Sequence, residues 1–190
     1  MDWGAKVELV GEVYDESYEY AMKLSQQNGS LFIHPFKDLL VQAGQGTLAL
    51  ELLKEPLFKK TEAILISVGG GGLISGMGAV LRALRPDIKI YGLTAQNAPA
   101  AYQAVKSQSP SEAPVQFTLA EGVATKRTES KMLESISANV DEILTLSEES
   151  IAKAISLLAE HGKMVVEGAG ALPIAAILEG LIPEKHITAV

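Results

Sequence analysis

Cysteine is missing from this 190-residue sequence, and that absence excludes several kinds of protein. Without a thiol, the chain has no disulfide framework, no thiolate metal site and no cysteine nucleophile. Aromatic residues make up only 5% of the sequence and charged residues 21%, whereas 47% of the residues are hydrophobic. This balance excludes general disorder, and a chain of this length can bury enough surface to fold without a disulfide or a metal.

Positive charge is scarce, since 16 Lys and Arg stand against 23 Asp and Glu and give a formal net charge of −7. An acidic chain repels phosphate backbones, and the basic pairs at 59–60 and 126–127 extend no further. A long apolar run is also lacking, because residues 68–81 are too few and too rich in glycine to span a bilayer. Residues 1–6 show no basic and apolar signal segment. We therefore expect a soluble cytoplasmic protein with no nucleic-acid or membrane partner.

Short apolar runs and helical patterns alternate along the chain. The strongest run, residues 63–68, is continuously apolar, as expected for a strand that is buried on both faces of a parallel sheet. Strands that alternate with helices predict an α/β fold, with an open, mostly parallel sheet and helices on both faces. The predicted helices cover residues 15–28, 45–55, 73–85, 98–106, 130–139, 147–161 and 168–179, and the predicted strands cover 6–10, 63–68, 88–92, 142–146, 164–166 and 187–190.

Both ends of the sequence lie in or next to predicted strands. Residues 187–190 stop inside an apolar, β-branched run, and residues 6–10 have no helix before them. A parallel strand cut at such a point would leave an exposed apolar edge. We therefore expect the fold to be incomplete and the chain to be a piece of a longer one.

Four consecutive glycines, Gly69, Gly70, Gly71 and Gly72, separate the strongest strand from the next helix. Such a run needs a physical reason, because glycine loses more backbone entropy on folding than any other residue. A loop without side chains can turn its N–H groups toward one point at the positive end of a helix, which suits a phosphate. The G-x-G-x-x-G dinucleotide motif and the nucleotide-hydrolysing P-loop are both absent. The alternative is a tight turn that only allows close packing of helix on sheet.

The segments around the glycines carry a family resemblance. The stretch V-G-G-G-G-L-I-S-G at 68–76 resembles the phosphate loop of the fold-type II pyridoxal-phosphate enzymes, in particular the serine/threonine dehydratase (threonine ammonia-lyase) and serine racemase group. Further similar segments follow the family order, at residues 4–11, 34–36, 43–47, 120–124 and 166–171. The resemblance implies a tryptophan-synthase-β-like fold. It also implies that residues 1–30 end a small substrate-side domain and that residues 31–190 form a large cofactor-phosphate-binding domain, truncated at its C-terminus.

The same resemblance implies pyridoxal 5'-phosphate as the cofactor and a β-hydroxy amino acid as the substrate, which is converted to a 2-oxo acid and ammonia. The cofactor phosphate would be bound by the backbone N–H groups of Gly69, Gly70, Gly71, Gly72 and Leu73. Glu167 matches a family acid near the cofactor ring. Its alternative role is that of a carboxylate stabilised by the dipole at the start of the helix that follows.

Two parts of the family site are not found. No lysine lies in the Ser-x-Lys-x-Arg-Gly setting of the Schiff-base lysine, so we predict no catalytic residue in this chain and no activity from the isolated chain. Racemase-like members bind a divalent cation at positions that correspond to Thr94, Ala98 and Ala100, which offer no carboxylate, so we predict no metal site there. The three histidines have no ligand spacing, and we expect His34 to be an ordinary satisfied or surface residue.

Three functions stay open at this point. The first is a dehydratase of amino-acid metabolism, including isoleucine biosynthesis, which forms a homo-oligomer at full length. The second is a non-catalytic module that binds a phosphate ligand. The third is a sister enzyme of the fold, such as serine racemase or a cysteine or threonine synthase. The segments at 34–36 and 43–47 favour the dehydratases.

Overall fold

A computed structural model describes residues 4–12 and 14–190 of the chain. Residues 1–3, which belong to the segment searched for a secretory signal, lie outside the described residues. The chain divides into two compact units, Met1–Ile33 and His34–Val190, each of which is described by itself. Within the described residues, no helix has the length and apolar character needed to cross a membrane.

The first unit contains one helix, α1 (Tyr14–Asn28), which ends at Gly29 in the left-handed region (φ 71°). The Ser17 hydroxyl on this helix donates to the Val10 carbonyl oxygen at 2.5 Å. The strand predicted over residues 6–10 is wrong, because this segment pairs with no strand of the described chain and Leu9 is exposed. Alternating side chains alone do not form a strand, since its backbone groups need a hydrogen-bonded neighbour.

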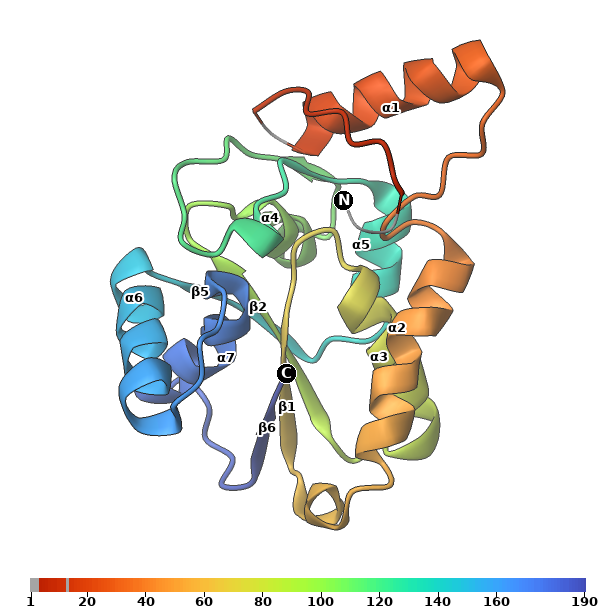
Figure 1. The fold of residues 1–190 in the computed structure, drawn as a ribbon. Coiled ribbons are helices and arrows are strands. Elements are labelled where there is room, and N and C mark those ends of the chain that lie inside the picture. The colour runs from red at the N-terminus through yellow and green to blue at the C-terminus, as the bar shows by residue number, and fades with distance from the viewer. Residues whose placement is uncertain (1–3, 13) are drawn as a thin grey trace. The chain divides into compact units, whose positions relative to one another are not determined.

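The second unit is built on a four-stranded sheet of order β5-β2-β1-β6, in which every pair is parallel (Figure 1). The strands are β1 (Ala63–Ser67), β2 (Lys89–Ala95), β5 (Glu142–Leu146) and β6 (Ile187–Ala189). A separate antiparallel pair joins β3 (Ser111–Glu112) to β4 (Arg127–Thr128). The predicted α/β class and parallel sheet are confirmed.

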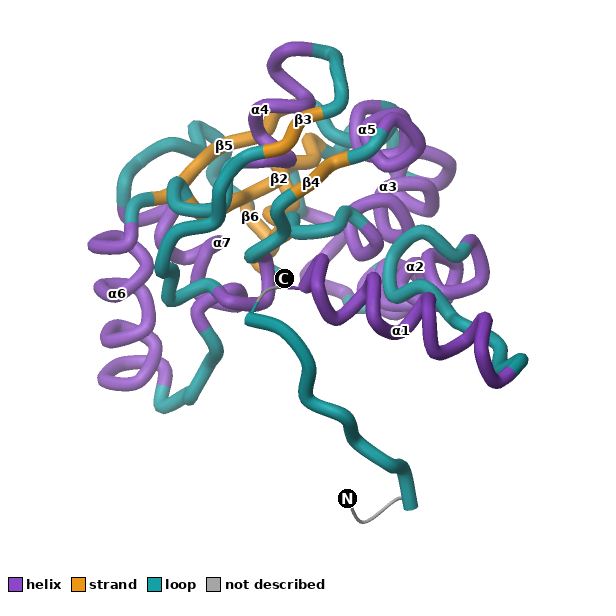
Figure 2. Tube along the Cα trace, turned by 90° about the horizontal axis from the view of Figure 1, so that it is seen from above, coloured by secondary structure: helices purple, strands orange, loops and turns teal. Residues whose placement is uncertain are grey.

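Helices cover both faces of this sheet, as predicted. Figure 2 shows α3 and α5 on one side of the strands and α6 and α7 on the other. The helices of this unit are α2 (Leu39–Leu52), α3 (Gly72–Leu84), α4 (Ala100–Ser107), α5 (Ser130–Ser137), α6 (Glu148–Leu157) and α7 (Gly168–Leu178). Shorter 3-10 turns cover Pro56–Lys60 and Glu121–Val123, and a π turn, Leu158–Gly162, continues α6.

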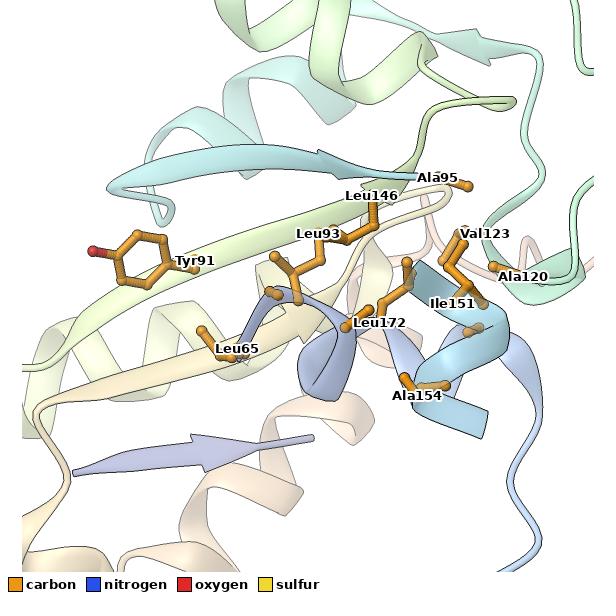
Figure 3. Packing of buried hydrophobic residues seen from close by; sticks show 14 of the residues in the cluster. Leu65, Tyr91, Leu93, Ala95, Ala120, Val123, Leu146, Ile151, Ala154 and Leu172 are labelled. Atoms are coloured by element: carbon orange, nitrogen blue, oxygen red, sulfur yellow. The ribbon is translucent and has the colours of Figure 1, made fainter. Parts of the chain in front are cut away.

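The core consists of two apolar clusters, one on each face of the sheet. Successive side chains of a strand point to opposite faces, so Leu65 packs toward α6 and α7, whereas Ile64 and Ile66 pack toward α3. Figure 3 shows the first cluster, in which Leu65 and Leu93 face Leu172 of α7. Because β1 is buried on both faces, its sequence is apolar throughout.

Two local predictions need correction. The helix predicted from residue 45 begins at Leu39, because the Asp38 carboxylate accepts hydrogen bonds from the N–H groups of Leu40 and Val41 and caps the helix. The strand predicted over residues 164–166 is an irregular segment in which Val165 is fully exposed. Apolar residues at this place therefore belong to a connection into α7, where they have no strand partner in the described chain.

Candidate functional site

A cavity of about 380 Å³ lies beyond the carboxyl end of β1, which is where open α/β sheets bind ligands. All six of the predicted site residues, Gly69, Gly70, Gly71, Gly72, Leu73 and Glu167, line this cavity. They come from two segments far apart in sequence, the loop after β1 and the start of α7. The structure thus brings the predicted residues together, while their role toward a cofactor stays a prediction.

The glycine loop ends at Gly71, which adopts φ 88° and occupies the N-cap position of α3. No side chain caps this helix, so the N–H groups of its first turn lack the usual side-chain acceptor. The same end carries the positive pole of the helix dipole. An anion placed in the cavity would satisfy both features.

Close packing also requires glycine in the loop. A Cβ atom on Gly69 would lie 2.9 Å from the Val123 Cα, a separation that real Cβ atoms do not show. A Cβ atom on Gly72 would lie 2.9 Å from the Phe36 Cβ. The packing explanation offered by the sequence therefore holds, and it operates together with the open helix end rather than instead of it.

Glu167 occupies the N-cap position of α7 but makes no capping hydrogen bond with its side chain. Glu167 is exposed, and its Oε1 lies 3.4 Å from the position that a Cβ on Gly122 would take. The carboxylate thus lines the cavity instead of closing its own helix. The role of Glu167 near a ligand stays a prediction, beside the alternative of a charge at the start of α7.

A hydrogen bond ties the two sides of the cavity together. The Ser67 hydroxyl, at the carboxyl end of β1, donates to the Ala169 carbonyl oxygen of α7 at 2.6 Å. The loop after β1 and the start of α7 are therefore held at a fixed spacing. Sequence reasoning missed Ser67, which no motif singled out.

The segment before α2 also lines the cavity, through Pro35 and Phe36. His34 Nδ1 accepts hydrogen bonds from the backbone N–H groups of Phe36 (3.3 Å) and Lys37 (3.2 Å), so this nitrogen carries no proton. Burial lowers the pKa of His34, with a further lowering by the nearby Lys37 charge. The Gln42 side-chain amide donates to the Phe36 carbonyl oxygen at 2.8 Å. These contacts satisfy the Nδ1 atom of His34.

Further lining residues were not predicted as site residues. They are Pro35, Phe36, Gln45, Ser67, Gly122, Val123, Ala169, Gly170 and Val190. Most belong to segments that the resemblance had already marked, at 34–36, 43–47, 120–124 and 166–171. Proximity to those marked segments was the available signal, although it gave no role to a single side chain.

The positions that correspond to the cation site of racemase-like members lie away from solvent. Thr94, Ala98 and Ala100 are buried, and the Thr94 hydroxyl donates to the Leu144 carbonyl oxygen at 3.3 Å. In the part of the chain that the structure describes, no group of three or more His, Cys, Asp or Glu side chains is placed to hold a metal ion.

Comparison with known proteins identifies the family. The family model described as "Pyridoxal-phosphate dependent enzyme" matches residues 1–190. The chain belongs to this family. The glycine loop and the cavity around it thus belong to a chain whose family depends on pyridoxal phosphate.

Relatives within the pyridoxal-phosphate dependent family narrow the group. The chain is 42% identical over 177 residues to an L-threonine ammonia-lyase of Geobacter sulfurreducens, covering 93% of this chain and 44% of that protein. It is 38% identical over 178 residues to an L-threonine ammonia-lyase of Thermotoga maritima, covering 94% of this chain and 44% of that protein. The chain thus spans about half the length of the curated relatives that it matches.

Solved structures of the family share the fold. A T.th. threonine deaminase superposes with a TM-score of 0.82 at 38% identity, over 89% of this chain and 58% of that one. A serine racemase from Dictyostelium discoideum superposes with a TM-score of 0.83 at 30% identity, over 99% of this chain and 61% of that one. The predicted membership of the fold-type II group with its dehydratase and racemase branches is confirmed.

Proposed function

We propose that the protein carrying this chain is a threonine or serine dehydratase that deaminates a β-hydroxy amino acid to a 2-oxo acid and ammonia. The observation that carries this proposal is the uncapped, side-chain-free start of α3 inside the cavity, in a chain similar over almost its whole length to L-threonine ammonia-lyases. We further propose a cytoplasmic, homo-oligomeric enzyme of amino-acid metabolism, with isoleucine biosynthesis as one setting.

The residues of the cavity fit the phosphate end of the cofactor. The places that side chains would fill at Gly69 and Gly72 are taken by neighbouring residues, so the loop backbone itself forms the wall. In this proposal the N–H groups of Gly69, Gly70, Gly71, Gly72 and Leu73 bind the phosphate. When bound, the cofactor supplies the electron sink for the negative charge left as the substrate loses its α-proton.

Glu167 is assigned a place beside the cofactor ring. Glu167 is exposed, lines the cavity and does not cap α7 with its side chain. A carboxylate at this place can accept a hydrogen bond from a polar atom of the ring. Residues 1–30 are assigned to the end of the small substrate-side domain and residues 31–190 to the large domain.

A lysine is required for this chemistry, and the cavity has none among the described residues that line it. A glycine loop that binds the phosphate, without a lysine, can bind the cofactor but does not hold it covalently. We therefore expect that the isolated 190-residue chain releases no 2-oxobutanoate from threonine. Release of 2-oxobutanoate by this chain alone would contradict the assignment of the missing nucleophile.

The decisive test uses the full-length protein that carries this sequence. L-threonine, L-serine and 3-hydroxyaspartate are supplied separately, and the 2-oxo acid and ammonia are measured together. We expect activity with at least one of them, and loss of that activity in the double variant Gly70→Val/Gly71→Val, because the new side chains clash with Phe36 and Ile136 and force the loop out of the conformation that binds phosphate. Gly44→Ala, at an exposed helix position with open space around it, is the control. Full activity in the double variant would reject the phosphate role.

Serine racemase is the second candidate, since a serine racemase structure matches 99% of this chain. The two activities are separated by their products, because a racemase forms D-serine from L-serine without net loss of ammonia. Equal or faster formation of D-serine than of 2-oxo acid would favour the racemase. Binding of pyridoxal phosphate with neither product formed would instead favour the non-catalytic module.

A further inference from the structure

Phe36 lies against the glycine loop and occupies the space that side chains on these glycines would need. A Cβ atom on Gly70 would lie 2.5 Å from the Phe36 Cγ, so it would clash with the aromatic ring. A Cβ atom on Gly72 would lie 3.1 Å from the Phe36 Cα. The side chain of Phe36 thus fills the volume that the two glycines leave empty.

Phe36 is itself fixed from several directions. Its N–H donates to His34 Nδ1, its carbonyl oxygen accepts from the buried Gln42 side chain, and the His34 ring packs edge-on against its ring at a centroid distance of 4.5 Å. The next residue, Lys37, forms an ion pair with Glu129 at 2.5 Å. These contacts join the segment to both α2 and the residue before α5.

A loop made of glycines has a flexible backbone, because glycine restricts φ and ψ least. Such a loop loses conformational entropy when it binds an anion. A rigid ring packed against the loop removes part of that freedom before the ligand arrives. We propose that Phe36 is a positioning residue, which holds the glycine loop in the conformation that binds the cofactor phosphate. This inference rests on the proposed phosphate site and adds a specific side chain to it.

The proposal predicts coupling between Phe36 and Gly70. In the full-length protein, Gly70→Ala places a methyl group against the Phe36 ring, too close for van der Waals contact, and should weaken binding of pyridoxal 5'-phosphate strongly. Phe36→Ala should weaken it by about tenfold, because the loop loses its support. In the double variant the methyl group finds space, so the loss should be smaller than the product of the two single losses by about fivefold or more.

The readout is equilibrium dialysis of the apoprotein with pyridoxal 5'-phosphate and, separately, with pyridoxal, which lacks the phosphate. A positioning role lowers the preference for the phosphorylated form, whereas a general loss of stability lowers both affinities alike. Phe36→Leu keeps apolar bulk and should restore part of the preference. Phe117→Ala, at an exposed phenylalanine, is the matched control and should leave it unchanged.

The outcomes separate this inference from the proposed function. A wild-type protein that binds both forms equally would reject the phosphate grip, and the role of Phe36 with it. A wild-type preference that survives in Phe36→Ala, or single effects that simply multiply in the double variant, would overturn the role of Phe36 alone. No substrate is needed, so the result does not depend on which amino acid the enzyme converts.

Discussion

Helices α2 and α3 pack against each other but begin in opposite ways. Helix α2 starts with a side-chain cap, since Asp38 accepts from the N–H groups of Leu40 at 2.8 Å and Val41 at 3.2 Å. Helix α3 starts at Gly71 with no side-chain cap and with the cavity in front of it. A helix start with a side-chain cap is stabilised by its own sequence, whereas an uncapped start leaves its backbone N–H donors available to a ligand.

Closing the open start should have the largest effect. Gly71→Asp brings a carboxylate to the N-terminus of α3, and we expect it to lower the affinity of the full-length protein for pyridoxal phosphate by about 100-fold, or near 2.7 kcal/mol. Repulsion between two negative charges and loss of the N–H donors act together.

The control for that change is Gly71→Asn, which has the same shape without the charge and tolerates a positive φ better than most residues. Both variants meet the Ile136 side chain in the same way. The difference between their dissociation constants, measured by dialysis, therefore reports the charge. Equal losses in the two variants would show that shape, not an anion site, governs this position.

A substitution at the contact between α2 and α3 should have the second largest effect. Gly46 of α2 and Gly76 of α3 meet there, and a Cβ on Gly46 would lie 2.8 Å from the Gly76 carbonyl oxygen. We expect Gly46→Ala to lower the free energy of unfolding by about 1–3 kcal/mol through overpacking. Chemical denaturation of the full-length protein measures this change.

Gly44→Ala is the matched control on the same helix, because no atom lies within 4 Å of its new Cβ. Here alanine should raise the free energy of unfolding by about 0.5–1 kcal/mol through helix propensity. The two alanine variants should thus differ in sign. A stabilising Gly46→Ala would mean that the helices separate more easily than this packing implies.

Opening the closed start is expected to have a smaller effect. Asp38→Ala removes the cap of α2 and should lower the free energy of unfolding by about 1 kcal/mol, whereas Asp38→Asn keeps a capping oxygen and should change it little. The affinity for pyridoxal phosphate should stay near that of the wild type in both. A large loss of affinity in Asp38→Ala would mean that the two helix starts are not separate devices.

Lowering the pH should have the smallest effect, through the change in stability that accompanies protonation of His34. His34 has a folded-state pKa below its ordinary value of about 6.5, chiefly because it is partly buried, with Lys37 lowering it and Glu129 and Asp38 raising it. In the window between the lowered pKa and about 6.5, the unfolded chain binds more protons, so stability rises with pH. The contribution is present above about 6.5 and is lost as the pH falls through the lowered pKa.

Thermal unfolding between about pH 5 and 7 can detect this effect. His34→Asn keeps an acceptor for the two backbone N–H groups but does not titrate, so its unfolding temperature should depend less on pH than that of the wild type. His34→Leu, without an acceptor, should be less stable at every pH in the window. An unchanged pH slope in His34→Asn would rule out His34 as the titrating group.

Most of the second unit could be predicted because its central strands, β1 and β2, are buried on both faces. The apolar run at 63–68 is typical of such a strand, and Gly69, Pro86 and Gly180 mark where elements stop. The two failed strands, at 6–10 and 164–166, have strand-like patterns, one alternating and one apolar, but no neighbour to pair with in the described chain. Pairing is a long-range property, which a short window of sequence does not contain.

The residues of the site likewise include some that the sequence could reveal and some that it could not. The glycines at 69–72 could be found because four adjacent glycines are costly and therefore conspicuous. Phe36 and Ser67 could not, because each acts through a contact with a residue distant in sequence: Phe36 with Gly70, and Ser67 with Ala169. The start of α2 was missed although Asp38 is an ordinary capping residue, since the apolar residues after it gave no clear helical face.

The backbone wall of the cavity also sets how the site responds to its surroundings. Peptide N–H groups neither titrate nor oxidise in the physiological range, and Glu167 is the only ionisable side chain among the described lining residues. While His34 is neutral, the affinity of the loop should therefore follow the ionisation of the phosphate, whose second pKa is about 6, rather than any ionisation of the protein. A site of this kind would keep its affinity through changes of redox state that disable a cysteine site.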